Sequence, residues 1–236
     1  MDKADFIYSK LKDGFGLKGA QGDITFSLRD FSIKVNQNNV VGNLVEEWLA
    51  KWMDRENIQN IHNIKQSSPD FFLNPDDLKA DWLEIKSFYE NPNFDVAAFR
   101  SFIQLIIDKP YKLQSKYLLI KYRMNDGIVT IEDFWMKKIW QICSSSERFP
   151  LKVQYKNKSI VNIRPCTWYS ENTNYPPFEC LEDFLAALEE TMYDYHDTRY
   201  LCDSWKTNVV ESYKKHYGIQ MNIPRWSEIK DKYAKR

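Results

Sequence analysis

The pattern that most constrains the fold is an amphipathic helix followed by short apolar runs typical of strands. Over residues 40–55, apolar side chains recur at intervals of three and four, which predicts a helix with one buried face. Two apolar runs follow, Phe71-Phe72-Leu73 and residues 82–86, separated by the turn residues Asn74-Pro75-Asp76-Asp77. A chain that mixes these two periods has to bury a helix face against a sheet face.

The remaining elements extend this pattern to the end of the chain. The mostly apolar run 117–120 predicts a buried central strand. Further helices are expected over residues 2–11, 94–107, 131–142, 181–195 and 205–217, and a hairpin is expected from strands 151–155 and 159–163. The sequence therefore predicts an α/β (α+β) fold, a central mixed β-sheet flanked by helices, in a single domain over residues 1–236.

Composition limits the class of protein. With 236 residues and 43% apolar residues, the chain can build a sizeable core, which argues against disorder. It holds no apolar run of 18 residues and no apolar leader after its first methionine, so no membrane association is expected. The four cysteines are irregularly spaced, which argues against a zinc ribbon or a disulfide scaffold and favours a reducing, cytoplasmic location.

Residues 14–22 hold four of the seven glycines and predict a loop, either mobile or wrapped around a substrate. The run Gly14-Phe15-Gly16-Leu17-Lys18-Gly19 formally matches GxGxxG. A dinucleotide site is rejected because no strand precedes the run and no amphipathic helix follows it directly.

Three polar side chains are expected to meet at one end of the predicted strands. Glu84 and Lys86 are two positions apart on a strand, so they share a face while Ile85 points into the core. Asp70 comes from the start of the preceding strand and can approach Glu84 across the hairpin. Two carboxylates can hold Mg²⁺, and a lysine beside them can orient a water, which is the chemistry that phosphodiester hydrolysis requires.

A fourth group is expected from the long helix. Glu46 lies one helical turn after Gly42, where a glycine permits close approach of the helix to the sheet. Glu46 is expected to support the metal or Lys86, with the adjacent Glu47 as an alternative.

Other interpretations of these residues stay open. Asp76, Asp77 and Asp81 are rival ligands, with Asp81 next after Asp70. Alternatively, Asp70 caps a turn and Glu84 with Lys86 form an exposed ion pair of little energetic weight. The three histidines share no metal-binding spacing, and His62, near the entry to the predicted strand, is interpreted as a turn residue, with a supporting role behind the metal ligands as the alternative.

Pro69-Asp70, Glu84-Ile85-Lys86 and the upstream Gly42-x-x-x-Glu46 together resemble the PD-(D/E)xK nuclease superfamily, and within it a small type II restriction endonuclease. The resemblance covers a catalytic core of about 35–125, which leaves about 126–236 for DNA-recognition and helical elements. It implies Mg²⁺ as cofactor, Asp70 and Glu84 as metal ligands, and double-stranded DNA cut to give 5′-phosphate ends. It also implies a homodimer, since two-fold protein symmetry matches palindromic DNA.

Although the net charge is zero, positive charge gathers in residues 109–123, in 152–164 and from Lys206 onward. The side chains expected to contact phosphates or bases are Lys152, Gln154, Lys156, Arg164 and Asn172, and the alternative is an ordinary exposed hairpin with no role in binding. Two other functions remain open at this point: a structure-selective repair nuclease of the same superfamily, and a DNA-binding protein without catalysis.

Overall fold

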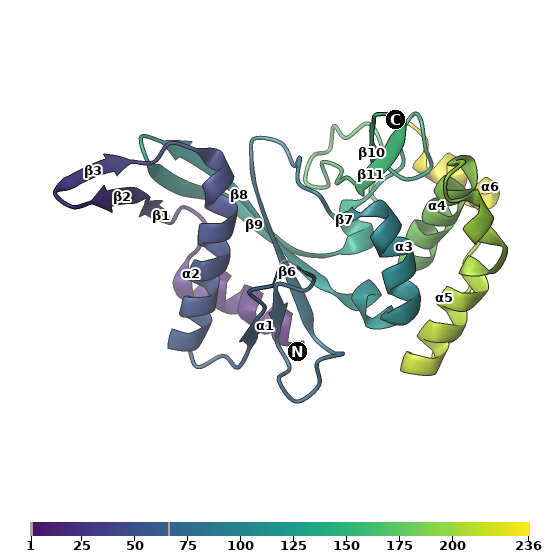
Figure 1. The fold of residues 1–236 in the computed structure, drawn as a ribbon, viewed down its shortest axis with the longest axis horizontal. Helices are drawn as coiled ribbons and strands as arrows, with labels where there is room; N and C mark the ends of the chain where they lie inside the picture. The colour runs from purple at the N-terminus through teal and green to yellow at the C-terminus, as the bar shows by residue number, and fades with distance from the viewer. Residues whose placement is uncertain (1, 66) are drawn as a thin grey trace. The chain divides into compact units, whose positions relative to one another are not determined.

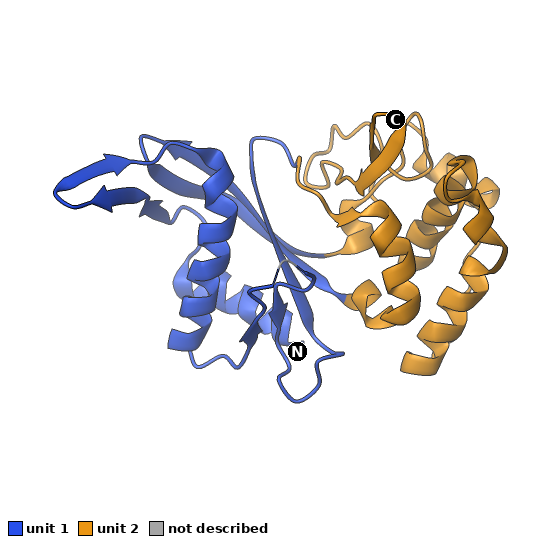
Figure 2. Ribbon diagram, in the orientation of Figure 1, with its two compact units in different colours: residues 1–92, 115–137 blue, residues 93–114, 138–236 orange. Residues whose placement is uncertain are grey.

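The computed structural model describes residues 2–65 and 67–236, and the chain divides into two compact units (Figure 2). Unit 1 comprises residues 1–92 and 115–137, and unit 2 comprises residues 93–114 and 138–236. That both units belong to a single domain over residues 1–236 stays a prediction.

Unit 1 is built on a six-stranded mixed sheet with two helices, α1 (Lys3–Ser9) and α2 (Val41–Arg55) (Figure 1). The strands lie in the order β1 (Gln21–Asp23), β9 (Ile128–Lys138), β8 (Lys116–Asn125), β6 (Trp82–Tyr89), β5 (Phe71–Phe72) and β4 (Ile61–His62). The central strands β6 and β8 run parallel, while β5 is antiparallel to β6 and β4 to β5. The predicted mixed sheet with flanking helices is confirmed.

One hydrophobic core holds unit 1 together. Buried side chains of α2, including Leu49 and Met53, pack in the same cluster as Leu83 and Ile85 of β6 and Leu118 of β8. The period of three and four in α2 and the alternation in β6 thus fill a single layer between helix and sheet.

A two-stranded hairpin, β2 (Thr25–Leu28) and β3 (Phe31–Lys34), extends from unit 1 away from the six-stranded sheet (Figure 1). The sequence prediction missed it, along with β1 and β4.

Unit 2 combines a small sheet with four helices. Its strands lie in the order β10 (Val153–Lys156), β11 (Ser159–Ile163) and β7 (Ala97–Ala98), and its helices are α3 (Phe99–Asp108), α4 (Leu181–Asp194), α5 (Cys202–Tyr217) and α6 (Trp226–Ile229). Helix α5 packs against α3 and α4, and the left-handed Gly218 ends it as predicted.

Most expected elements are confirmed, with small shifts at their ends, but the helix expected over 131–142 is wrong. Strand β9 occupies Ile128–Lys138, and a short 3-10 helix covers Ile139–Ile142. Asp126 and Gly127 form the tight turn that joins β8 to β9, and both have positive φ (47° and 71°). The β-branched run that follows this turn is typical of a strand.

Two other boundaries are also wrong. Residues 97–98 form a strand, so the helix expected from residue 94 begins at Phe99. The loop expected over 14–22 is shorter, because a π-helix covers Lys10–Phe15 and β1 begins at Gln21. Between the π-helix and β1, Gly19 donates its backbone N–H to the Ile131 carbonyl, so this segment is held against β9.

Among the described helices, none has the length and apolar content needed to cross a membrane.

Candidate active site

Strand β6 presents an acid and a base on one face. The Lys86 Nζ lies 3.8 Å from the Glu84 Oε2, while Leu83 and Ile85 point into the core from the opposite face. Glu84 is 4% exposed, so its carboxylate lies in a low-dielectric setting, whereas the Lys86 side chain is 25% exposed. This arrangement is the one predicted from the Glu-x-Lys spacing, and it differs from the exposed ion pair considered as the alternative.

Asp70 joins this pair from the neighbouring strand. Phe71 pairs with Leu83, which places Asp70, one residue before β5, beside the middle of β6. The backbone N–H of Ile85 donates a 2.6 Å hydrogen bond to the Asp70 Oδ2. Burial and the nearby charge of Glu84 raise the pKa of the Asp70 carboxyl to about 6, against the opposing effects of Lys86 and the Ile85 amide.

Glu46 approaches from α2, and its partner is His62. The Glu46 Oε1 lies 2.8 Å from the His62 Nε2, and the charge of Glu46 also contributes to raising the pKa of Asp70. His62 is a residue of β4 and stacks on Phe71, with ring centroids 4.7 Å apart. The interpretation of His62 as a turn residue is therefore wrong. No spacing rule links it to Glu46, because the antiparallel register of β4 and β5 sets its place.

Gly42 lies where α2 passes close to β6. A Cβ built on Gly42 would lie 3.4 Å from the Ser87 Oγ, at the lower end of ordinary van der Waals contact. The predicted close approach of helix and strand is therefore present, one turn before Glu46.

Ser68 is a member of this group that the sequence did not indicate. Its hydroxyl donates a hydrogen bond to the Glu84 Oε1, two residues before Asp70. Serines are common in loops, and no motif distinguishes this one from its neighbour Ser67.

The rival carboxylates have other surroundings. Asp76 and Asp77 are exposed in the turn before β6, where the Asp77 Oδ1 accepts the backbone N–H of Lys79. Asp81 directly precedes β6 in a left-handed conformation (φ 52°). The charges that act on Asp70 are those of Glu84, Lys86 and Glu46.

The residues expected to contact DNA all belong to unit 2. Gln154 accepts a hydrogen bond from Asn162 across the β10–β11 hairpin, Arg164 is paired with Asp95, and Lys156 and Asn172 are exposed. Lys152 is half-buried and lines a small polar cavity with Ser144 and Thr173.

A buried carboxylate, Glu84, a half-buried one, Asp70, and a lysine at neighbouring strands are a constellation suited to hydrolysis of an anionic ester. Comparison with known proteins gives the class: the chain is a type II restriction endonuclease, a site-specific deoxyribonuclease. More particularly, it belongs to the family of the NgoBV restriction endonuclease, which it matches over residues 1–233.

Individual relatives agree with this assignment. The type II restriction enzyme NlaIV of Neisseria lactamica is 44% identical over 238 residues, which covers 99% of this chain and 98% of that enzyme. The type II restriction enzyme NgoBV of Neisseria gonorrhoeae is 38% identical over 157 residues, 65% of this chain and 89% of that enzyme. A solved structure of the NlaIV restriction endonuclease superposes with a TM-score of 0.93 and covers 99% of this chain and 97% of its own.

Proposed function

We propose that this restriction endonuclease is a PD-(D/E)xK enzyme that uses Mg²⁺ to hydrolyse double-stranded DNA, with Asp70, Glu84, Lys86 and Glu46 as its catalytic residues. The observation that carries the proposal is that half-buried Asp70 lies beside buried Glu84 and next to Lys86. Burial first, and the nearby negative charge of Glu84 second, raise the pKa of the Asp70 carboxyl to about 6, and a bound cation would stabilise the ionised form against both effects.

The donor set fits magnesium. In the part of the chain that the structure describes, no group of three or more His, Cys, Asp or Glu side chains is placed to hold a metal ion. Mg²⁺ is commonly bound through one or two carboxylates and keeps several waters, so Asp70 and Glu84 suffice as its protein ligands. When bound, the ion supplies positive charge against the phosphate and lowers the pKa of water.

The other groups act on the water and on the ligands. Lys86, held near Glu84, would donate a hydrogen bond to the attacking water and keep it in line with the bond from phosphorus to the leaving 3′-oxygen. Ser68 and the Ile85 amide fix the orientations of Glu84 and Asp70. Glu46, fixed in turn by His62, would support the metal or Lys86. The product is a 5′-phosphate end and a free 3′-hydroxyl.

DNA binding is assigned to unit 2, through Lys152, Gln154, Lys156, Arg164 and Asn172. Cationic side chains position the phosphates, and amide side chains suit the reading of base edges. Arg164 would exchange Asp95 for a DNA phosphate. A homodimer would present two such sites to the two strands of a palindromic sequence.

Incubation of the protein with phage DNA tests the proposal. Discrete fragments in Mg²⁺, their loss in excess chelator, and 5′-phosphate ends on the fragments are expected. Asp70→Ala and Lys86→Ala should each abolish cutting while DNA binding and cooperative unfolding persist. Cutting retained by either variant would contradict the assignment of the site, and a continuous smear of products would contradict site-specific cleavage.

A further inference from the structure

The β2–β3 hairpin has one face that is entirely apolar and exposed. Cross-strand pairing sets Phe26 opposite Ile33 and Leu28 opposite Phe31, which places all four side chains on the same face. Their exposed fractions are 58% for Phe26, 67% for Leu28, 69% for Phe31 and 46% for Ile33. Isolated large apolar side chains are common on protein surfaces, but four that form one contiguous apolar face are unusual.

The opposite face of the same hairpin is polar and internally paired. Ser27 and Ser32 share a 2.8 Å hydrogen bond across the strands, and Lys34 forms an ion pair with Asp23, which also accepts a hydrogen bond from Thr25. The hairpin is therefore as amphipathic as a strand pair that covers a core. A two-stranded hairpin is marginally stable by itself in water, and among the residues described in unit 1 none covers the apolar face of this one.

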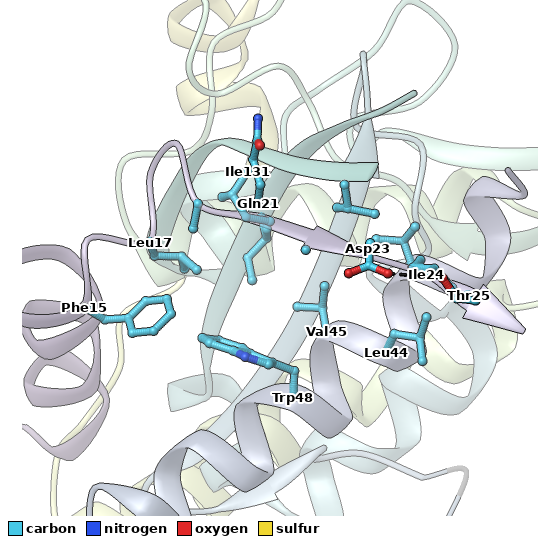
Figure 3. Close-up of a pocket in the computed structure, with 15 residues that line it drawn as sticks. Phe15, Leu17, Gln21, Asp23, Ile24, Thr25, Leu44, Val45, Trp48 and Ile131 are labelled. Carbon is cyan, nitrogen blue, oxygen red and sulfur yellow. Dashed lines mark hydrogen bonds between the residues drawn. The ribbon is translucent and has the colours of Figure 1, made fainter. Parts of the chain in front are cut away.

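This apolar face continues into a cavity at the base of the hairpin. Ile24, which shares the face of Phe26 by strand alternation, lines a cavity of about 400 Å³ (Figure 3). Phe15, Leu44, Val45 and Trp48 enclose it from the π-helix and α2, and Figure 3 shows these side chains directed into the cavity. Three of them, Phe15, Leu44 and Trp48, are themselves more than a third exposed. Hairpin face and cavity thus form one apolar surface.

We infer that this surface, the hairpin residues Phe26, Leu28, Phe31 and Ile33 with the adjoining cavity, is where a second copy of the chain docks. The inference rests on the proposed homodimer and specifies its interface. A two-fold axis brings the same patch of both copies together, so the hairpin of each copy would cover the apolar surface of the other.

The area of the surface supports this occupant. A whole aromatic side chain has an area of about 150–250 Å². On this scale the exposed parts of the four hairpin side chains amount to roughly 400 Å². The exposed parts of Phe15, Leu44 and Trp48 at the cavity add about 200 Å². One partner in a standard interface buries about 800 Å², of which the polar rim is a part. A roughly 600 Å² apolar patch is at the upper limit for a monomer's surface, yet it is the right size for the apolar centre of a dimer interface.

Measurement of molar mass by light scattering after size exclusion tests the inference on the full chain. The wild type should have twice the 28.2 kDa mass of the chain at micromolar concentration, and the double variant Phe26→Ser/Phe31→Ser should have the mass of a monomer. The matched control, Ser27→Ala/Ser32→Ala on the polar face of the same hairpin, should remain a dimer. Circular dichroism and thermal unfolding establish that the variants keep the fold of unit 1.

Amide hydrogen exchange provides a second measurement that does not depend on a variant. The amides of residues 24–35 should be protected in the wild type at concentrations where it is dimeric and should lose protection on dilution to the monomer. A wild-type monomer, a Phe26→Ser/Phe31→Ser dimer, or concentration-independent exchange in these residues would overturn the inference. Because mass and exchange are read without DNA, an inactive dimer would contradict the proposed nuclease while leaving this interface in place.

Discussion

The backbone N–H of Ile85 points at the Asp70 carboxylate, 2.6 Å from its Oδ2, so strand β6 contributes its main chain as well as two side chains to the candidate site. The side chain of the same residue is buried in the core of unit 1. Packing of Ile85 therefore fixes the position of Asp70 relative to Glu84 and Lys86, which lie on either side of Ile85 in the strand. The cluster is held by the sheet rather than by a flexible loop.

The raised pKa of Asp70 predicts a dependence of stability on pH in metal-free protein. The unfolded carboxyl has a pKa of 3.8 and the folded one a pKa of about 6, so between these values the folded state holds the proton more tightly. The free energy of unfolding should therefore decrease as pH rises from about 4 to about 6, by no more than roughly 3 kcal/mol. Urea denaturation at a series of pH values measures this slope, and Asp70→Asn should flatten it. An equal slope in that variant would assign the effect to other groups.

Magnesium should reverse this penalty, because binding to Asp70 and Glu84 stabilises only the folded state. At a Mg²⁺ concentration 100 times the dissociation constant, the gain is about 2.7 kcal/mol, seen as a rise in the melting temperature. Glu84→Gln should lose this rise, whereas Asp76→Asn, in the exposed turn, should retain it. Since the ligands must be ionised, the rise should also shrink below pH 6. If Asp76→Asn lost the rise in melting temperature, Asp76 rather than Asp70 would be assigned as a metal ligand.

The sequence predicted the cluster of Asp70, Glu84 and Lys86 because each member depends on local rules. Alternation in a strand sets Glu84 beside Lys86, and a hairpin connection brings Asp70 to the next strand. Ser68 and His62 were not predictable in the same way, because their contacts depend on a loop conformation and on the pairing of β4 with β5. Neither is encoded in a fixed spacing.

The error in the fold has a similar origin. Apolar residues of β9 are spaced so that Ile131 and Phe134 are both buried, three apart, which mimics a helical period. The Asp126-Gly127 turn was the signal that distinguishes the two structures, since a tight hairpin requires the next segment to be a strand. The β2–β3 hairpin was missed although Phe26, Leu28, Phe31 and Ile33 alternate with polar residues, the period of two that is typical of strands.

His62 is predicted to be a positioning residue for Glu46. Removal of a hydrogen-bond partner behind a catalytic carboxylate typically reduces activity about 10–100-fold. His62→Ala should lower kcat to that extent, and His62→Gln, which can still donate a hydrogen bond to Glu46, should restore much of it. The control is His196→Ala, since His196 is 70% exposed in unit 2 and pairs with Asp197. If His62→Gln were as impaired as His62→Ala, the stacking on Phe71 rather than the bond to Glu46 would account for the loss.

The close approach of α2 to β6 at Gly42 predicts how much bulk the site tolerates. Gly42→Ala should be nearly neutral for activity, because the added Cβ meets the Ser87 Oγ at 3.4 Å, an ordinary contact distance. Gly42→Leu has no such room and should push α2 from the strand, at a cost in stability of about 1–3 kcal/mol. Since Glu46 lies one turn further along α2, the kcat of Gly42→Leu should decrease at least tenfold while its helix content, measured by circular dichroism, persists.

Asn43→Leu, at the exposed neighbouring position, is the matched control and should cut DNA at the wild-type rate. Wild-type kcat in Gly42→Leu would show that the spacing of helix and strand does not set the position of Glu46.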